Sequence, residues 1–465
     1  MKIKIKNLGI IEQAEINLKP LTVFIGENNT GKTWTAYLLA AIFGVEAYKE
    51  YLETQLDLKN EVNYPPLETA VKQLIEEGNA QLDLVNFSQE YLEKYINGVA
   101  DLAASLMNEF MCSQRISFDN LDVKIELGKS ANHYFAKIGN AAIESKISAS
   151  KRSKKGLLNA VKESNNNRVY FYSGNESDIL QKLPEKVIRE FIYEVVFQTI
   201  HRSFYGYTYP FPTERTTFIT LPLFNKIQKE KVFTVADANE ITNDLKNETP
   251  INAVQRFIFT MLTASQKNFT EREKEIKDKP KIQKYINLAK LLEQDILKGK
   301  VDFEPSELRR ELLFQTSNEM KLEMPIVSSM VKELAPLVLC LRYLVEPDEW
   351  LIIDEPEMNL HPSAQVEMIE FLAMLVQAGL NVLITTHSPY IVDHLSNLMR
   401  AAKRDDQEAI KERFYLGNIE AFISQEKVGV YLFKDRTAKN ILNEEGFIDW
   451  ETFSNVSDDI SHIFS

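Results

Sequence analysis

The segment from Gly26 to Thr33 limits what this chain can fold into more than any other feature. It reads Gly-Glu-Asn-Asn-Thr-Gly-Lys-Thr, follows the apolar run Leu21–Ile25 and precedes the helix-like stretch Trp34–Phe43. A strand, a glycine-rich loop and a helix in this order form a cradle for phosphate. The glycines let successive backbone N–H groups point inward, and the helix N-terminus adds its positive end. The sequence therefore predicts a nucleoside triphosphate site.

The residues of this loop have separate expected tasks. Lys32 is expected to reach the β- and γ-phosphates as a mobile positive charge, and the Thr33 hydroxyl is an expected ligand of Mg²⁺. The other loop residues are expected to hold the nucleotide through the bent backbone: Gly26, Glu27, Asn28, Asn29, Thr30 and Gly31. The expected cofactors are therefore ATP and Mg²⁺.

Two later apolar runs end in residues of matching chemistry. The run Trp350–Pro356 reads as a strand that ends in two carboxylates. Asp354 suits the shell of a Mg²⁺ ion on the triphosphate, and Glu355 can polarise a water molecule for attack on the γ-phosphate. The second strand, Asn381–Thr386, ends in His387, which suits a sensor of the γ-phosphate. We therefore expect Glu355 and His387 to be the catalytic residues.

At these residues the chain resembles the ABC-type ATPase heads of chromosome-structure and DNA-repair ATPases. It is closer still to the prokaryotic OLD-like family (overcoming lysogenization defect) and its stand-alone antiviral-defence relatives. Met1–Pro20 is similar to the first hairpin of those heads, Asp354–Pro362 to their Walker B strand and D-loop, and Thr386–Pro389 to their switch-histidine segment. The resemblance implies an α/β fold, an ABC-type P-loop ATPase head with a large, mainly helical insertion.

The same resemblance points to a signature segment at Val327–Glu333. In such heads, serines of this segment contact the γ-phosphate held by a partner subunit. Ser328 and Ser329 are the matching residues, but Met330 stands where the family usually has glycine. Because glycine permits close approach of the backbone to phosphate, its loss favours slow hydrolysis. The resemblance implies a homodimer or higher homo-oligomer with ATP sandwiched between heads.

A weaker match lies at Phe211–Arg215, which is similar to a Pro-Ala-Glu-Arg segment of these heads. The resemblance makes Glu214 and Arg215 candidates to reach the nucleotide. The alternative is an exposed ion pair, which would contribute little to stability.

The motifs divide the chain into three parts. Residues 1–45 and 318–465 are expected to form the head, with a closing strand near Lys427–Phe433. Residues 46–317 are the expected insertion, with strands that return to the head at about 204–232 and 296–317. Sustained heptads are missing from the insertion, so a compact helical structure is favoured over a long coiled-coil arm.

Composition excludes several classes of protein. The net charge of −13 over 465 residues argues against a broadly DNA-coating surface. The densest basic patch, Lys151–Lys155, reads better as a solvated loop, although a DNA contact there stays open. Cys112 and Cys340 are too few and too far apart for a disulfide framework or a zinc hook. No apolar run approaches the span of a membrane, which indicates a cytoplasmic protein without membrane contact.

OLD-like nucleases carry a metal-dependent TOPRIM nuclease after the ATPase, and residues 401–465 leave no room for one. The resemblance therefore favours an ATPase that senses a trigger or regulates a separate effector, a nuclease or toxin, in prokaryotic antiviral defence. One alternative is a DNA-repair or chromosome-maintenance ATPase. Another is an ATP-gated scaffold with little turnover, which Met330 keeps open.

Overall fold

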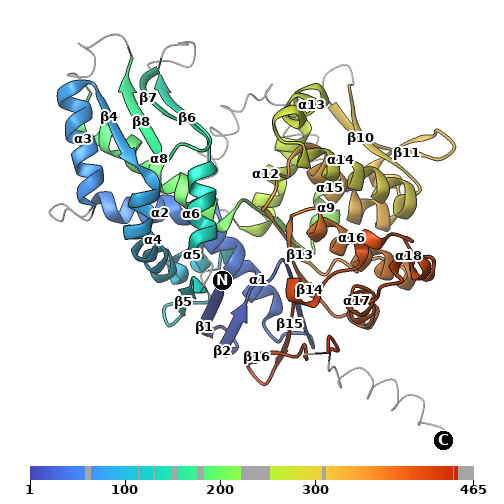
Figure 1. Ribbon diagram of the computed structural model, residues 1–465. Coiled ribbons are helices and arrows are strands. Elements are labelled where there is room, and N and C mark those ends of the chain that lie inside the picture. The colour runs from blue at the N-terminus through green and yellow to red at the C-terminus, as the bar shows by residue number, and fades with distance from the viewer. Residues whose placement is uncertain are drawn as a thin grey trace, which may run out of the picture. The chain divides into compact units, whose positions relative to one another are not determined.

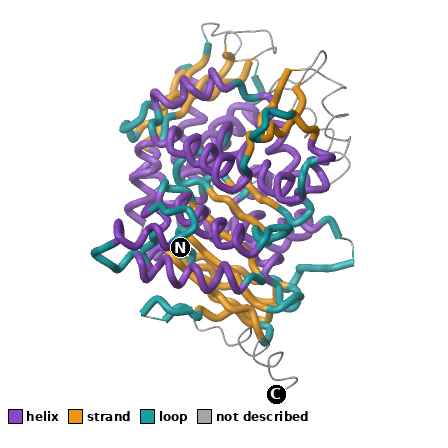
Figure 2. The backbone as a smooth tube through the Cα atoms, turned by 90° about the vertical axis from the view of Figure 1, so that its right-hand side faces the viewer, coloured by secondary structure: helices purple, strands orange, loops and turns teal. Residues whose placement is uncertain are grey.

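The protein is described by a computed structural model over residues 1–57, 64–113, 115–128, 131–148, 156–174, 183–220, 252–305, 310–443 and 445–448. The chain divides into two compact units. The first comprises Met1–Ile3, Ala41–Leu106 and Leu121–Tyr207, and the second comprises Lys4–Ala40, Met107–Asn120 and Thr208–Ser465. Helices account for more of the described chain than strands do (Figure 2).

The second unit is built on a large mixed sheet. Within this unit the strands lie in the order β1-β2-β16-β15-β3-β14-β13-β9. The strands β9, β13, β14, β3 and β15 pair parallel to one another, and β15 pairs antiparallel to β16. Their bounds are β1 Lys2–Leu8, β2 Ile11–Asn17, β3 Leu21–Gly26, β9 Thr208–Phe211, β13 Trp350–Asp354, β14 Asn381–Thr386, β15 Val428–Lys434 and β16 Thr437–Asn440.

The centre of this sheet is buried on both faces. Every residue of β3 and β13 is buried, and so are five of the six residues of β14. Continuous apolar runs of this kind are typical of parallel strands covered by helices on both sides. The strands expected at Leu21–Ile25, Trp350–Pro356, Asn381–Thr386 and Lys427–Phe433 are thereby confirmed, and Figure 1 shows β13, β14 and β15 among the helices of this unit.

The helices of the second unit supply most of its buried apolar side chains. In α15 and α16 nearly every residue from the second turn onward is buried. Their bounds are α1 Lys32–Phe43, which ends in the first unit, α9 Arg215–Thr220, α12 Ala253–Gln266, α13 Phe269–Asp278, α14 Lys281–Leu291, the π-helix η2 Leu292–Leu297, the 3-10 helix η3 Met324–Ile326, α15 Ser329–Tyr343, α16 Pro362–Gln377, α17 Pro389–Ala401, α18 Gln407–Ile410, and the 3-10 helices η4 Lys411–Arg413, η5 Ile419–Ala421 and η6 Gln425–Lys427.

The second unit also contains a small antiparallel sheet. The strands expected to return to the head at 296–317 form β10 (Gly299–Pro305) and β11 (Arg310–Thr316). They pair with β12 (Lys321–Glu323) and not with the large sheet. Val301 and Phe303 are buried while their neighbours are partly exposed, and such alternation suits a sheet covered on one face only.

Of the segment expected to return at 204–232, β9 does join the large sheet, where it pairs parallel to β13. Residues 221–251 lie outside the described residues, as do the basic patch Lys151–Lys155 and residues 449–465.

The first unit combines helices with a four-stranded antiparallel sheet of order β4-β8-β7-β6. It holds much of the expected insertion, but it ends at Tyr207 and not near residue 317. Its longest helix, α8, has 21 residues, which fits a compact insertion. The bounds are α2 Val45–Asp57, α3 Pro65–Glu77, β4 Asn79–Asp83, α4 Leu84–Asp101, α5 Ala103–Met111, which ends in the second unit, β5 Asp122–Glu126, α6 Ala131–Asn140, β6 Ile143–Ser148, β7 Gly156–Lys162, β8 Arg168–Ser173 and α8 Glu185–Tyr205.

Candidate functional site

The loop between β3 and α1 has a backbone that only glycine can supply at two positions. Gly26 and Gly31 have φ angles of +143° and +97°. A Cβ atom at Gly26 would lie 2.5 Å from the Phe433 carbonyl oxygen, and one at Gly31 would lie 2.6 Å from Ile11 Cδ1. Side chains are therefore excluded on steric grounds as well as by conformation. The loop residues between them, Glu27, Asn28 and Asn29, are exposed.

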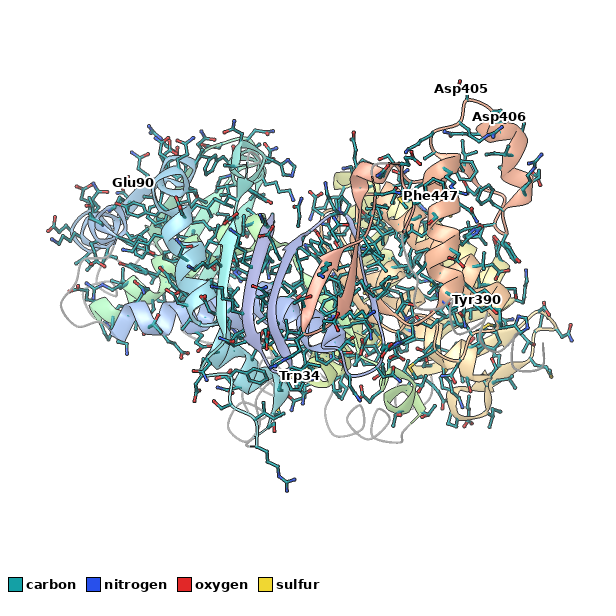
Figure 3. All side chains as sticks on the ribbon, turned by 90° about the horizontal axis from the view of Figure 1, so that it is seen from below. Trp34, Glu90, Tyr390, Asp405, Asp406 and Phe447 are labelled. Carbon is teal, nitrogen blue, oxygen red and sulfur yellow. The ribbon has the colours of Figure 1, made fainter. Side chains whose placement is uncertain are left out.

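The turn between β1 and β2 also requires glycine. Gly9, between β1 and β2, has a φ of +58°, and a Cβ atom there would lie 1.8 Å from a ring carbon of Trp34. The Trp34 ring therefore packs directly on the backbone of this turn, beside the strands of the large sheet (Figure 3). The first turn of α1 is thus fixed against the sheet that carries the loop.

Lys32 lies at the bottom of the loop and is 5% exposed. Its Nζ atom donates to the carbonyl oxygens of Gly26 at 3.0 Å and Glu27 at 2.6 Å. Burial lowers the pKa of Lys32 to about 8, although the nearby carboxylates Glu355 and Asp354 act in the opposite direction. Within the described residues no carboxylate forms an ion pair with this ammonium group. A buried cation held only by backbone carbonyls suits an anionic ligand such as a phosphate chain.

Asp354 ends β13 beside the first turn of α1. The Thr33 hydroxyl donates to Asp354 Oδ1 at 3.0 Å, and the Thr385 hydroxyl at the end of β14 donates to the same oxygen. The carboxyl group is 2% exposed, and burial raises the pKa of Asp354 against the effect of these two hydrogen bonds. A carboxylate and a hydroxyl at the mouth of a phosphate loop are oxygen ligands of the kind Mg²⁺ prefers. These residues therefore fit a magnesium ion.

Glu355 and His387 face each other at the neighbouring strand ends. Glu355 Oε1 lies 3.4 Å from His387 Nε2, and both side chains are about one-third exposed, at 32% and 28%. The hydrogen bond from His387 is the main reason that the pKa of Glu355 is lowered. Glu355 has a φ of +48°, a conformation uncommon outside glycine, and its N–H donates to the carbonyl oxygen of Thr385 at 3.1 Å. An ionised, accessible carboxylate held in this way can accept a proton from water.

Glu357 belongs to the site although sequence reasoning assigned it no role. Its Oε1 atom accepts from the Thr386 hydroxyl and from the His387 N–H, each at 2.7 Å. Burial raises the pKa of Glu357. This carboxyl group follows β13 and accepts hydrogen bonds from the end of β14, so it holds the backbone of His387 in place. The only signal in the sequence was its place in the segment similar to a D-loop.

Arg215 does not form the exposed ion pair that was the alternative to a nucleotide contact. It is 2% exposed and forms a buried ion pair with Glu333 on α15. Its guanidinium group also donates to the carbonyl oxygens of Pro212 at 2.9 Å, Asp354 at 2.7 Å and Glu355 at 2.8 Å. Arg215 therefore holds the backbone that carries the two carboxylates. Glu333 ends the expected signature segment, but no role was expected for it, because its partner Arg215 lies more than a hundred residues away in the sequence.

Ser328 and Ser329 lie at the N-terminus of α15 and are exposed. Ser328 is the N-cap of the helix, and its hydroxyl accepts from the Val331 N–H at 3.3 Å. The helix also carries Glu333, so it is joined to the Asp354 strand through Arg215. The structure thus brings together Lys32, Thr33, Asp354, Glu355 and His387, and leaves the two serines on the surface.

Comparison with known proteins identifies the family of this chain. The family described as AAA ATPase domain matches residues 1–392. No curated protein matches this chain. Among the described residues, no helix is long and apolar enough to cross a membrane.

Three solved structures are similar to this chain at low identity. The SMC head domain from Thermotoga maritima is 10% identical with a TM-score of 0.30, over 95% of this chain and 97% of that chain. An Smc head domain with an extended coiled coil, bound to the C-terminal domain of ScpA and derived from Pyrococcus furiosus, is 10% identical with a TM-score of 0.36, over 99% and 98%. An SmcHead bound to the C-winged helix domain of ScpA is 8% identical with a TM-score of 0.34, over 95% and 96%. Likeness at this level supports no conclusion about function.

Proposed function

Because this chain belongs to the AAA ATPase domain family, we propose that it uses ATP at the P-loop site to control a separate effector, a nuclease or toxin, in prokaryotic antiviral defence. ATP binding and hydrolysis follow from the family. The observation that supports chemistry at this site is the Glu355–His387 pair, 3.4 Å apart, beside the Asp354–Thr33 pair. The defence role rests on the resemblance of the motif segments to the OLD-like ATPases.

Each residue of the site has a separate role in hydrolysis. Lys32 and the loop backbone hold the β- and γ-phosphates, and Thr33 and Asp354 hold the magnesium ion. That ion neutralises charge on the phosphate oxygens when it is bound. Glu355 accepts the proton of the attacking water molecule. His387 reaches the γ-phosphate and keeps Glu355 oriented through their hydrogen bond.

The exposed start of α15 is proposed as the face that meets a second copy of the chain. Ser328 and Ser329 are exposed there, and two large apolar side chains just before them are exposed as well, Met320 at 57% and Ile326 at 69%. Contiguous exposed apolar surface is typical of sites that bind a partner. Hydroxyl groups on this face would contact the γ-phosphate held by the other copy, while Met330 keeps turnover slow.

The first experiment tests the ATP site. Lys32→Ala should abolish tight ATP binding in calorimetry, because the charge that opposes the phosphates is lost. Glu355→Gln should bind ATP with unchanged affinity and lose turnover, since an amide keeps the shape but accepts no proton. Unchanged ATP affinity in Lys32→Ala would contradict the assignment of the loop.

The second experiment tests the effector. The full chain is expressed with and without the protein encoded beside it, and growth and nucleic-acid integrity are scored. Damage should require both proteins and should change in Lys32→Ala and Glu355→Gln. Cleavage of DNA or RNA by this chain alone, unaffected by Glu355→Gln, would refute the regulatory role. A repair nuclease as the neighbour would favour the alternative of DNA repair or chromosome maintenance, and negligible turnover with an intact ATP-dependent dimer would favour an ATP-gated scaffold.

A further inference from the structure

The four-stranded sheet of the first unit is buried on one face and exposed on the other. In β8, Val169 and Phe171 are 0% exposed, and the Phe171 ring lies edge-on to Phe191 of α8 with 6.3 Å between the ring centroids. The alternate residues Tyr170 and Tyr172 point to the other face, called the open face, and are 42% and 41% exposed. Because β8 lies between β4 and β7, this tyrosine pair stands in the middle of the sheet (Figure 1).

The spacing of the tyrosine pair suits unpaired bases. A strand rises about 3.3 Å per residue, so residues two apart on one face are about 6.7 Å apart. Neighbouring bases of a duplex are only about 3.4 Å apart, so two bases can each lie on one of these rings only when they are drawn apart. Exposed aromatic rings on a sheet are a common platform for the bases of single strands, since every base has a flat face that stacks.

Amide side chains stand beside both rings of the tyrosine pair. Tyr172 lies directly opposite Asn79 of β4 and Asn159 of β7. Tyr170 lies directly opposite Gln81 of β4. Opposite residues of an antiparallel pair share a face, and their Cβ atoms are about 5 Å apart. Since an amide both donates and accepts hydrogen bonds, these side chains can contact the edge of a base whose flat face rests on a ring.

The strands that form this sheet are rich in basic residues. Residues 143–173, which contain β6, β7 and β8, hold seven basic and two acidic residues, in a chain whose net charge is −13. Four of the seven belong to Lys151–Lys155, which lies outside the described residues. A local excess of positive charge favours a polyanion as the partner. It disfavours a second copy of the same face, because like charges would meet.

On the open face, basic side chains lie at both ends of the tyrosine pair. Arg168 is exposed two residues before the pair on β8, and Lys146 of β6 is exposed in the row of the other end. Two acidic side chains share the face. Asp83 caps α4 by accepting from the Asn86 N–H at 2.9 Å, and Glu144 lies on the edge strand β6. Arg168 and Lys146 are thus placed to meet the phosphates on either side of two stacked bases.

We propose that the open face of this sheet binds single-stranded nucleic acid. Two successive bases stack on the tyrosine pair, and the amides beside the rings contact the edges of these bases. Arg168 and Lys146 pair with the flanking phosphates. Stacking and amide contacts are open to DNA and RNA alike, so the ligand is an unpaired strand of either kind. The residues involved belong to the first unit, whereas the P-loop site belongs to the second.

The test measures the fluorescence anisotropy of labelled oligonucleotides mixed with the full chain, whose P-loop site is saturated with magnesium and a slowly hydrolysed ATP analogue. The probes are an oligodeoxythymidylate and an oligouridylate of about 12 nucleotides, a length that one single-strand-binding fold can cover, and a DNA duplex of equal length. At least one single strand should bind at least about tenfold more tightly than the duplex. The tighter of the two identifies the ligand as DNA or RNA.

The tyrosine variants test the stacking. Tyr170→Thr and Tyr172→Thr should each weaken single-strand binding by about tenfold, as expected for the loss of one stacked base. Threonine suits these variants because it keeps a high preference for strands. Tyr170→Phe and Tyr172→Phe keep the rings and should bind like the wild type. The matched control is Tyr415→Thr, which removes a tyrosine of the second unit that is 57% exposed and should leave binding unchanged.

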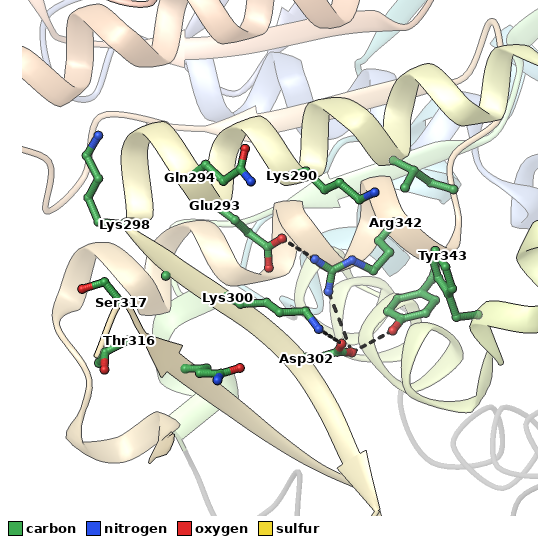
Figure 4. A pocket seen from close by; sticks show the side chains of 14 residues that line it. Lys290, Glu293, Gln294, Lys298, Lys300, Asp302, Thr316, Ser317, Arg342 and Tyr343 are labelled. Atoms are coloured by element: carbon green, nitrogen blue, oxygen red, sulfur yellow. Dashed lines mark hydrogen bonds and ion pairs between the residues drawn. The ribbon is translucent and has the colours of Figure 1, made fainter. Parts of the chain in front are cut away.

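A lysine variant tests the phosphate contact. Lys146→Gln should lower the slope of log affinity against log salt concentration by about one, as expected for the loss of one phosphate contact. The matched control is Lys300→Gln. Lys300 is also an exposed lysine on a strand of a small antiparallel sheet, but it pairs with Asp302 at 3.0 Å, as Figure 4 shows. Its removal should leave the slope unchanged.

Three results would overturn the proposal. The first is that neither single strand binds, or that the duplex binds as tightly. The second is that the phenylalanine variants lose as much affinity as the threonine variants, or that Tyr415→Thr loses as much. The third comes from sedimentation of the same proteins: if the threonine variants dissociate an oligomer while oligonucleotide binding stays unchanged, the open face is a contact between copies of this chain.

Discussion

The buried pair of Arg215 and Glu333 gives the sharpest prediction. In the variant Glu333→Leu, Arg215 keeps its three carbonyl acceptors but loses the only carboxylate with which it forms an ion pair among the described residues. Removing one partner of a buried ion pair typically costs about 3–5 kcal/mol, because an uncompensated charge stays buried. Since Arg215 is 2% exposed and the Glu333 side chain is 0% exposed, solvent screening is weak. We expect a loss of about 3 kcal/mol at pH 8.

The assay is unfolding in urea followed by tryptophan fluorescence. Trp34 and Trp350 belong to the second unit, so their fluorescence follows the unit that holds the pair. Arg215→Met and the double variant complete a double-mutant cycle. Because two apolar residues leave no charge buried, the double variant should cost less than the two single changes together, with a coupling energy of about 2 kcal/mol.

The same variants should lower kcat, because Arg215 donates to the carbonyl oxygens of Asp354 and Glu355 and so positions both carboxylates. A cost of less than about 0.5 kcal/mol for Glu333→Leu would refute this reasoning, as would strict additivity in the cycle. If the expected stability is lost but kcat does not change, the Arg215–Glu333 pair is a purely structural contact.

The remaining predictions concern proton linkage, catalysis and the loop. Burial raises the pKa of Glu333 to about 7, so the folded protein binds this proton more tightly than the unfolded chain does. The stability that the bound proton contributes is complete below about pH 4.5 and is lost as the pH rises through 7. Glu333→Gln should therefore reduce the dependence of the unfolding free energy on pH, measured from pH 4 to 8. Lys32 has a pKa of about 8 before phosphate binds, so ATP binding near pH 8.5 should take up a proton, seen by calorimetry in buffers of different ionisation enthalpy; the absence of uptake would contradict a phosphate contact. His387→Ala should lower kcat by roughly 10- to 100-fold and affect ATP affinity less, and an unchanged rate would remove the histidine from the reaction. Gly31→Ala should destabilise the second unit by about 1–3 kcal/mol in urea unfolding, since the added Cβ meets Ile11 at a φ of +97°; an unchanged midpoint would show that the loop can adapt.

The sequence was informative wherever function depends on a short stretch of chain. The glycine-rich loop, its flanking strand and its helix are contiguous, so their pattern predicts their geometry. Asp354, Glu355 and His387 follow two buried apolar runs, and the ends of parallel strands meet at one edge of a sheet. Their grouping with Thr33 could therefore be expected, and the contacts Thr33–Asp354 and Glu355–His387 are present in the structure.

Tertiary structure alone decided which distant segments meet. No local pattern indicates that β14 lies between β3 and β13, or that β10 and β11 form a sheet of their own. For Arg215 the sequence left open a nucleotide contact and an exposed ion pair, because polarity in a sequence does not report burial. In the folded chain Arg215 is buried against Glu333 and the backbone of Asp354, since a charge can be buried wherever long-range packing supplies a partner and acceptors for its hydrogen bonds. Local chemistry follows from adjacent residues, whereas burial and partnership depend on contacts between residues far apart in the chain.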